Sequence, residues 1–361
     1  MKHLKMFMIN KIIVLFSIAL SMLIATTCTR TEKQTSQIFL YGEGHGVERI
    51  MNKQLEIWHE YYHQQKMRHL FIEFPYFTAE YFNIWMQSDS DDILEELFNE
   101  WAGTLAHNPN VLAFFKAIKS KFPETIFHGV DVGHGFYSTG ERFLQYLQDN
   151  NMQDTERHLL TLEAIKQGEI WQKNRDDEFR ENAMAENFIR EFDKLGNQNV
   201  MGIFGSVHAS FGNMGAEGYP DVKTLAERLK ERYGRSVNTT DMTIVTWHIN
   251  PIKTEIVSIN GKDYVASYFG TDFTAFRDIV SMSYWRLENA YDDFKGKPAN
   301  RDILPIKQYP MKIERKQVFF VDAELSDGAV NRSFYRSDMN IKEKINGKLF
   351  KMPITTGFNI E

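Results

Sequence analysis

The chain has 361 residues, of which 43% are hydrophobic and 25% are charged, proportions that are ordinary for a soluble globular protein. Its formal net charge is -6 and it contains no basic stripe, which argues against a protein that binds nucleic acid. A chain of this length can hold one large α/β domain or two smaller ones. The single cysteine, Cys28, argues against a disulfide framework and against a zinc site built from cysteines.

Residues 1–28 are predicted to be a signal peptide or a membrane anchor. Three lysines precede an uncharged apolar run over residues 12–27, the pattern of a secretory signal, although the run is short for a full membrane span. Cys28 follows the run, in a position that resembles the lipid-modified cysteine of bacterial lipoproteins. We therefore expect an exported protein of the cell envelope, held at a membrane by this segment or by a lipidated Cys28, with residues 29–36 as a polar tether.

Residues 37–250 are predicted to form an α/β domain with a mostly parallel sheet flanked by helices, because short apolar runs alternate with segments of helical periodicity. The expected strands are 38–41, 70–72, 126–130, 199–204 and 243–248. The expected helices are 47–67, two or three short ones between 78 and 119, one capped by Ser138 or Thr139 that continues to Gln148, a long helical segment over 154–195 with Gly168 as its candidate break, and 221–233 closed by Gly234.

The pattern changes after Pro251. Short β-rich runs follow, separated by turns such as Asn260-Gly261-Lys262; they cover residues 254–259, 264–269 and 317–321. Residues 251–361 are therefore expected to form a β-rich C-terminal extension of the same domain or a small appended lobe.

Polar side chains follow four of the expected strands. In chain order they are Glu43 and His45, Glu73, Asp131 and His134, and His208. Because the carboxyl ends of parallel strands lie at one edge of a sheet, we expect these side chains to meet in one cleft. For any one of them taken alone, the alternative is a buried residue that caps a helix or satisfies a loop.

The long helical segment adds Arg180 to this group. Arg180, Met184 and Asn187 share one helix face. The planar guanidinium of Arg180 is suited to hold a carboxylate of the site or an anionic substrate group. The alternative is a surface ion pair with Asp176 or Glu181.

These pieces together resemble the erythromycin esterase, ChaN and TIKI superfamily. The resemblance spans residues 38–232 and rests on an ordered set of motifs: Gly42-Glu43-Gly44-His45, Phe71-Ile72-Glu73-Phe74, Gly129-Val130-Asp131, Arg180 with Met184-Ala185, and Gly205-Ser206-Val207-His208. Each motif is unspecific by itself, whereas the ordered set is fairly specific. The region after residue 250 gains little from it.

The resemblance to the esterases implies that His45 acts as general base on water, with support from Glu73 and His208, and that an ester or lactone is opened. The chemistry of the residues agrees, because a carboxylate can orient the histidine and His208 or Arg180 can stabilise an oxyanion. No Gly-x-Ser-x-Gly motif is present, so water is the better nucleophile. The predicted catalytic residues are His45, Glu73, His208, Glu43 and Arg180, and the predicted substrate-binding residues are Asp131, His134 and Asn187.

The esterase hypothesis requires no cofactor. Other members of the superfamily imply two alternative functions, each of which involves a bound haem or metal. ChaN-like members are lipoproteins linked to haem uptake, for which Tyr41, Tyr76 and the histidines are candidate axial ligands. TIKI-like members are thought to bind a metal in a protease, and here the candidate ligands of a divalent metal are His45, Glu73 and His208. The first motif has one residue between its glutamate and its histidine, as in ChaN-like proteins, whereas the esterases typically have two.

Overall fold

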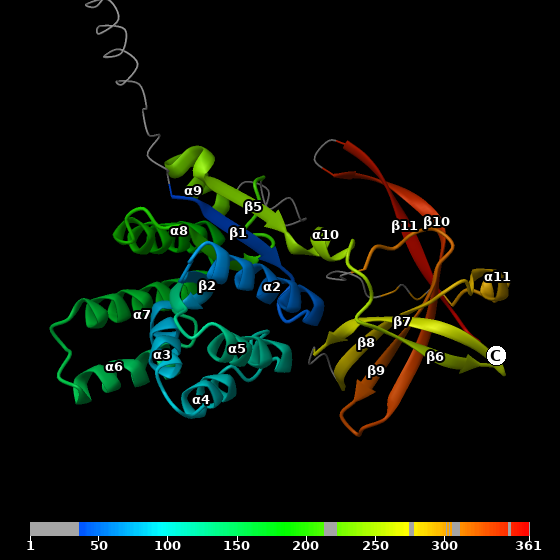
Figure 1. The fold of residues 1–361 in the computed structure, drawn as a ribbon, viewed down its shortest axis with the longest axis horizontal. Coiled ribbons are helices and arrows are strands. Elements are labelled where there is room, and N and C mark those ends of the chain that lie inside the picture. Colours follow the sequence, from blue (N-terminus) through cyan, green and yellow to red (C-terminus); the bar gives the residue numbers. More distant parts are fainter. Residues whose placement is uncertain are drawn as a thin grey trace, which may run out of the picture. The chain divides into compact units, whose positions relative to one another are not determined.

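A five-stranded sheet and a six-stranded sheet make up the β-structure of the computed structural model (Figure 1). The model describes residues 36–212, 222–273, 278–300, 302, 304, 311–345 and 348–360. The first sheet has the strand order β3-β2-β4-β1-β5, and every neighbouring pair in it is parallel. Its strands are β1 (Ile38–Glu43), β2 (His69–Pro75), β3 (Ile126–Asp131), β4 (Val200–Gly205) and β5 (Val237–Asp241). All five carboxyl ends therefore lie along one edge.

Helices cover both faces of the parallel sheet. The helices of this region are α2 (Glu48–Gln64), α3 (Tyr76–Met86), α4 (Asp92–Glu100), α5 (Pro109–Lys121), α6 (Glu141–Asp149), α7 (Glu156–Asn174), α8 (Asp177–Lys194), α9 (Leu225–Tyr233) and α10 (Met242–Thr246). Successive strand residues point to opposite faces. Leu40 accordingly packs in one core with α8 and α9, whereas the neighbouring Tyr41 packs in the other with α2 to α6.

The second sheet is antiparallel throughout, with the strand order β11-β10-β9-β8-β7-β6. Its strands are β6 (Lys253–Ile259), β7 (Lys262–Asp272), β8 (Ile279–Leu287), β9 (Val318–Leu325), β10 (Val330–Ile345) and β11 (Lys348–Phe358), with the short helix α11 (Tyr291–Phe294) between β8 and β9. Trp285 stacks on Phe320 in its core, with ring centroids 5.6 Å apart. The prediction of an α/β domain followed by a β-rich C-terminal part is confirmed.

Four of the five predicted strands are confirmed, and the fifth is wrong. Strand β5 occupies Val237–Asp241, ahead of the predicted 243–248, and Met242–Thr246 forms the short helix α10. The side chain of Asp241 accepts a hydrogen bond from the backbone N–H of Thr243 and so caps this helix. The β-branched residues that suggested a strand lie instead in the helix that this cap begins.

The boundaries of two predicted helices also differ from the structure. The segment 154–195 breaks at Arg175, which has φ 50°, and not at Gly168, which lies inside α7. The helix before residue 150 is not capped by Ser138 or Thr139, because Phe136–Gly140 forms a π-helical turn and α6 begins after it. The hydroxyl of Thr139 donates to Glu100 instead.

The predicted signal segment, Cys28 and residues 29–35 of the predicted tether lie outside the described residues. Residues 37–361 form one unit that contains both sheets. Within the described residues, none of the helices has both the length and the apolar character that crossing a bilayer requires.

Candidate active site

The structure brings the strand-end residues of β1 to β4 together at the carboxyl edge of the parallel sheet. Glu43 is the last residue of β1 and lies in register with Gly205, the last residue of β4. Asp131 ends β3 and lies in register with Pro75 of β2. His45 occupies the turn after β1, and His208 occupies the turn after β4. The strand order itself therefore brings these residues together, as we expected from the sequence.

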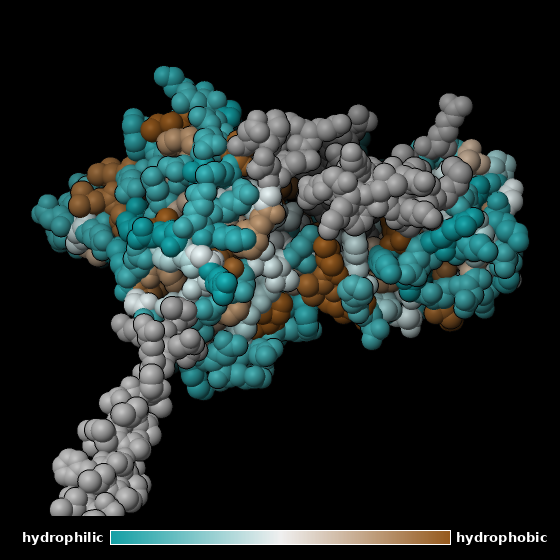
Figure 2. All heavy atoms as spheres, turned by 90° about the horizontal axis from the view of Figure 1, so that it is seen from above, coloured by the Kyte–Doolittle hydropathy of each residue, from teal (hydrophilic) through white to brown (hydrophobic). Residues whose placement is uncertain are grey.

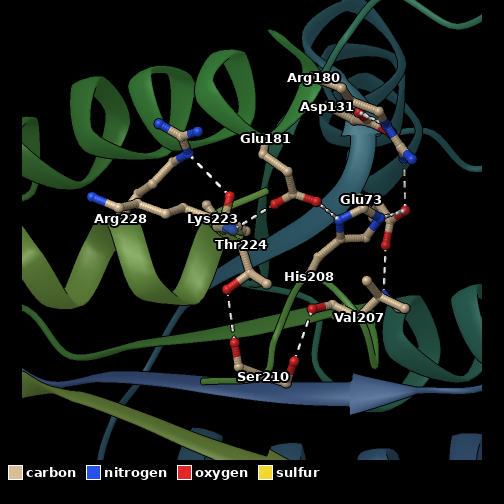
Figure 3. Close-up of polar contacts among 12 residues, drawn as sticks. Glu73, Asp131, Arg180, Glu181, Val207, His208, Ser210, Lys223, Thr224 and Arg228 are labelled. Atoms are coloured by element: carbon tan, nitrogen blue, oxygen red, sulfur yellow. Dashed lines mark hydrogen bonds and ion pairs between the residues drawn. The ribbon is translucent and has the colours of Figure 1, made fainter. Parts of the chain in front are cut away.

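The carboxylate of Glu73 lies between Arg180 and His208 (Figure 3). Its Oε1 accepts a hydrogen bond of 2.8 Å from Nη2 of Arg180 and lies 3.3 Å from Nε2 of His208. Its Oε2 accepts a hydrogen bond from the backbone N–H of Gly205 and lies 3.8 Å from Nε2 of His45. One carboxylate thus links two imidazoles and a guanidinium.

His45 is held on its other side by Glu43. The distance from Nδ1 of His45 to Oε1 of Glu43 is 2.9 Å. The second oxygen of Glu43 accepts a hydrogen bond of 2.6 Å from the side-chain amide of Gln54, a fully buried residue of α2. The side chain of His45 is 31% exposed, compared with 9% for Glu43 and 11% for Glu73. Of these three side chains, His45 is therefore the one that a small molecule reaches most easily.

His208 has a second carboxylate partner, Glu181 of α8 (Figure 3). Glu181 is 1% exposed and also accepts a hydrogen bond of 2.5 Å from the backbone N–H of Leu225, at the start of α9. The N-terminus of a helix favours a negative charge, so this position suits an ionised glutamate. Glu43, His45, Glu73, His208 and Glu181 form a chain in which carboxylates and imidazoles alternate.

Sequence reasoning missed Gln54 entirely and treated Glu181 only as a candidate surface partner of Arg180. Both have a signal in the sequence, because each is a polar residue on an otherwise apolar helix face. Gln54 lies four residues from Ile50 and from Trp58, and Glu181 lies four residues before Ala185. Such a polar residue, buried on an apolar face, needs a polar partner.

Arg180 links the β2 and β3 ends of the site (Figure 3). Its Nε and Nη2 donate to the two oxygens of Asp131 at 2.9 and 2.6 Å, and Nη2 also reaches Glu73. The first of the two sequence-based alternatives, a guanidinium that holds carboxylates of the site, is therefore the one observed. Nε2 of His134 lies 3.1 Å from Oδ2 of Asp131. Asn187 points elsewhere, because its amide donates to the carbonyl of Val130 and to Gln167.

The negative charges around the two histidines hold protons on them. Burial alone would lower the pKa of His45, but the charge of Glu73 and the hydrogen bond to Glu43 raise it to about 9. Burial likewise opposes the charge on His208, yet Glu73 and Glu181 together raise its pKa to about 10. Burial would raise the pKa of Glu73, but the charges of His208, His45 and Arg180 lower it. At neutral pH the site contains ionised Glu73 and two imidazolium cations.

These residues line a cavity of about 510 Å³. Its polar part contains seven of the eight predicted site residues: Glu43, His45, Glu73, Asp131, His134, Arg180 and His208. Asn187, predicted to bind substrate, is not among the described residues that line it. The rest of the wall is mainly apolar, and most of it comes from β2, α5, the segment after α4 and the turn at residues 135–139.

The described side chains are not arranged as a site for a metal ion, and the two tyrosines predicted as haem ligands lie away from the cavity. No group of three or more His, Cys, Asp or Glu side chains in the described part of the chain is arranged to hold a metal. Both ring nitrogens of His45 and of His208 lie close to carboxylate oxygens of the site. Of the candidate haem ligands, Tyr41 and Tyr76 do not line the cavity, and burial raises the pKa of both hydroxyls, which disfavours a tyrosinate ligand. The histidines His45, His134 and His208 do line it.

Comparisons with known proteins give only remote likenesses. No protein-family model matches the chain, and no curated protein matches it. Among solved structures, it is similar to a structural-genomics target from Bacillus cereus (14% identity, 58% of this chain and 66% of that chain, TM-score 0.41). It is also similar to a mutant of the erythromycin esterase EreC in its open conformation (10% identity, 57% and 69%, TM-score 0.43) and to a succinoglycan biosynthesis protein (14% identity, 58% and 67%, TM-score 0.41). The matched region spans slightly less than two thirds of the first of these chains.

Proposed function

We propose that the protein is a hydrolase in which His45 activates water for attack on an ester or a lactone. The observation that carries the proposal is the position of His45 in the cavity wall. Its Nδ1 is fixed by Glu43 at 2.9 Å, and its Nε2 side lies toward Glu73 and the cavity. A histidine that is oriented by a carboxylate and accessible to small molecules has the arrangement of a general base.

In the proposed reaction, neutral His45 takes a proton from water as the water oxygen bonds to the carbonyl carbon. The carbonyl oxygen becomes an oxyanion in the resulting tetrahedral intermediate. The charge of His208 and the Nη1 group of Arg180 stabilise it; among the described residues, Nη1 has no hydrogen-bond acceptor. The intermediate then collapses, the bond to the alcohol oxygen breaks, and protonated His45 returns its proton to that oxygen. The products are a carboxylic acid and an alcohol, or a hydroxy acid from a lactone.

The test is a panel of esters and lactones assayed with the wild type and with His45→Asn, with and without a chelator. Loss of a general base typically costs ~10²–10⁴-fold in rate, and we expect a loss of that size with the fold unchanged, because His45 lies in a turn and not in the core. His59→Asn, on the exposed side of α2, is the matched control and should retain full activity. Full activity of His45→Asn would refute the mechanism. Activity abolished by the chelator would favour a metal-dependent hydrolase instead.

We also propose that the protein is exported and held at a membrane surface. The proposal rests on the lysines and the apolar run ahead of Cys28. Cell fractionation tests it, with Cys28→Ser to separate lipidation from anchoring by the apolar segment. Protein in the cytoplasm with Met1 intact would contradict export.

A further inference from the structure

The cavity has a polar end and an apolar end. Four aromatic side chains, which we call the aromatic wall, line the apolar end: Phe74, Trp101, Phe114 and Phe115. Phe74 lies 5.1 Å from Trp101 and 5.9 Å from Phe115, measured between ring centroids, and Phe114 lies 5.5 Å from Phe115. Contacts of this kind hold the rings in fixed positions. The apolar surface is thus formed in advance and directly adjoins His45 and Glu73.

Two large, mainly apolar side chains of the cavity wall are exposed to solvent. Leu105 and Tyr137 both line the cavity, and their side chains are 64% and 65% exposed. The face of the molecule in Figure 2 is largely hydrophilic, with apolar side chains gathered in local patches. Apolar side chains at the mouth of a cavity favour the entry of an apolar group.

The polar end carries more carboxylates than arginine and lysine side chains. Arg180 is the only arginine or lysine among the described residues that line the cavity, and it is engaged by both Asp131 and Glu73. The same wall carries four carboxylates, on Glu43, Glu73, Glu100 and Asp131. A negatively charged group on the substrate would be repelled by these carboxylates, and the cationic groups beside them, Arg180, His45 and His208, already face carboxylates of the site.

We infer that the substrate is an uncharged ester whose acyl group is bulky and apolar and lies against the aromatic wall. This inference rests on the proposed function and adds the substrate class to it. The cavity volume of about 510 Å³ limits the size of the substrate. Cavities of about 300–1,000 Å³ typically hold ligands of drug size, and this cavity lies in the lower half of that range. An ester of medium chain length fills it, and a much longer chain projects through the mouth.

The experiment compares p-nitrophenyl acetate, butyrate, hexanoate, octanoate and dodecanoate as substrates. We expect kcat/KM to rise by up to about fourfold for each added methylene, the factor that burial of one methylene supplies, and to stop rising near hexanoate or octanoate. An ester with a terminal carboxylate on its acyl chain should be turned over far more slowly than its uncharged counterpart. Thermal stabilisation of the His45→Asn variant by the same esters measures binding without turnover.

Two variants test the location of the acyl group. Val111→Trp places a large side chain in the apolar end and should move the optimum to a shorter ester. Leu105→Ser changes an exposed residue, so folding is not at risk, and should lower the ratio of octanoate to acetate activity several-fold. Leu159→Ser is the matched control, because Leu159 is 63% exposed and does not line the cavity; it should leave the ratio unchanged.

The outcomes separate this inference from the proposed function. The inference would be overturned if turnover did not depend on chain length and if neither Val111→Trp nor Leu105→Ser changed the ratio of octanoate to acetate activity. The hydrolase proposal would still stand. Failure to hydrolyse any ester, together with stronger binding of octanoate than of acetate by His45→Asn, would overturn the hydrolase proposal and support an apolar binding site.

Discussion

A Cβ atom built on Gly205 lies 3.0 Å from Nε2 of His45. The same atom lies 3.4 Å from Oε2 of Glu73, to which the backbone N–H of Gly205 donates a hydrogen bond. The last residue of β4 therefore has two functions, and the first of them favours glycine. It leaves space for the imidazole of His45, and it brings a backbone donor close to the central carboxylate.

Gly205→Ala should reduce kcat at least about tenfold while the protein stays folded, because displacement of a catalytic group by a fraction of an ångström to 1 Å is costly in rate. The added methyl group displaces His45 or Glu73, both of which are accessible from the cavity and can shift without disturbing the core. Gly296→Ala is the control, since a Cβ atom there meets no atom within 4 Å. Circular dichroism verifies the fold of both variants. Equal kcat for Gly205→Ala and the wild type would show that the space around His45 is not critical.

The activity should increase with pH over the neutral range. His45 acts as a base only when it is neutral, and its pKa is raised to about 9, so most molecules carry the inactive imidazolium at pH 7. We expect kcat/KM to rise about tenfold per pH unit up to about pH 9. A fall should follow as His208, whose pKa is raised to about 10, loses its positive charge. Because both histidines contact Glu73, the two limbs report the linked pair and not single residues.

A pH-stat assay with a neutral ester gives this profile directly, and the His45→Asn variant supplies the background rate. A rate that stays constant between pH 6 and 9 would contradict the assignment of His45 as the base.

Glu181→Gln should destabilise the protein and change the pH dependence of its stability. The variant keeps the size of the side chain but removes the charge that faces Nδ1 of His208. Charged His208 contributes stability that is fully present below about pH 6.5 and is lost as the pH rises through about 10. The variant should lose about 2 kcal/mol of unfolding free energy at neutral pH and show a weaker decline toward alkaline pH.

Urea unfolding at several pH values measures this effect. Glu186→Gln is the control, because Glu186 lies on the exposed side of the same helix. Parallel pH curves for Glu181→Gln and the wild type would mean that Glu181 does not hold the charge on His208.

The sequence was sufficient to predict the positions of most site residues but not their partners. Glu43, Glu73, Asp131 and His208 follow strands, and the parallel topology alone brings strand ends to one edge. No local pattern shows that Glu73 accepts from the backbone of Gly205, because 132 residues separate them. The alternating chain of carboxylates and imidazoles, and with it the raised pKa values, is a property of the tertiary structure.

Local sequence patterns also failed to show the contacts behind the two main errors in the predicted fold. The stretch 243–248 is rich in β-branched residues, which favour strands, but the cap at Asp241 begins a helix there. Gly168 suggested a helix break because glycine is a poor helix former. In the structure it lies within α7, where a Cβ atom would be 2.2 Å from the carbonyl oxygen of Gly133. A close approach between two backbones requires glycine as much as a turn does.

Gly168→Ala therefore provides a test in which helix propensity predicts a gain in stability and packing predicts a loss. In an unobstructed helix interior, alanine is more stable than glycine by about 1 kcal/mol. Here the added methyl group collides with the backbone of Gly133, so we expect a net loss of about 1–3 kcal/mol, the usual cost of overpacking. Gly133 lies between Asp131 and His134, so activity should fall as well. Urea unfolding and kcat measure the two effects. An increase in stability would show that α7 and the turn at Gly133 can move apart without cost.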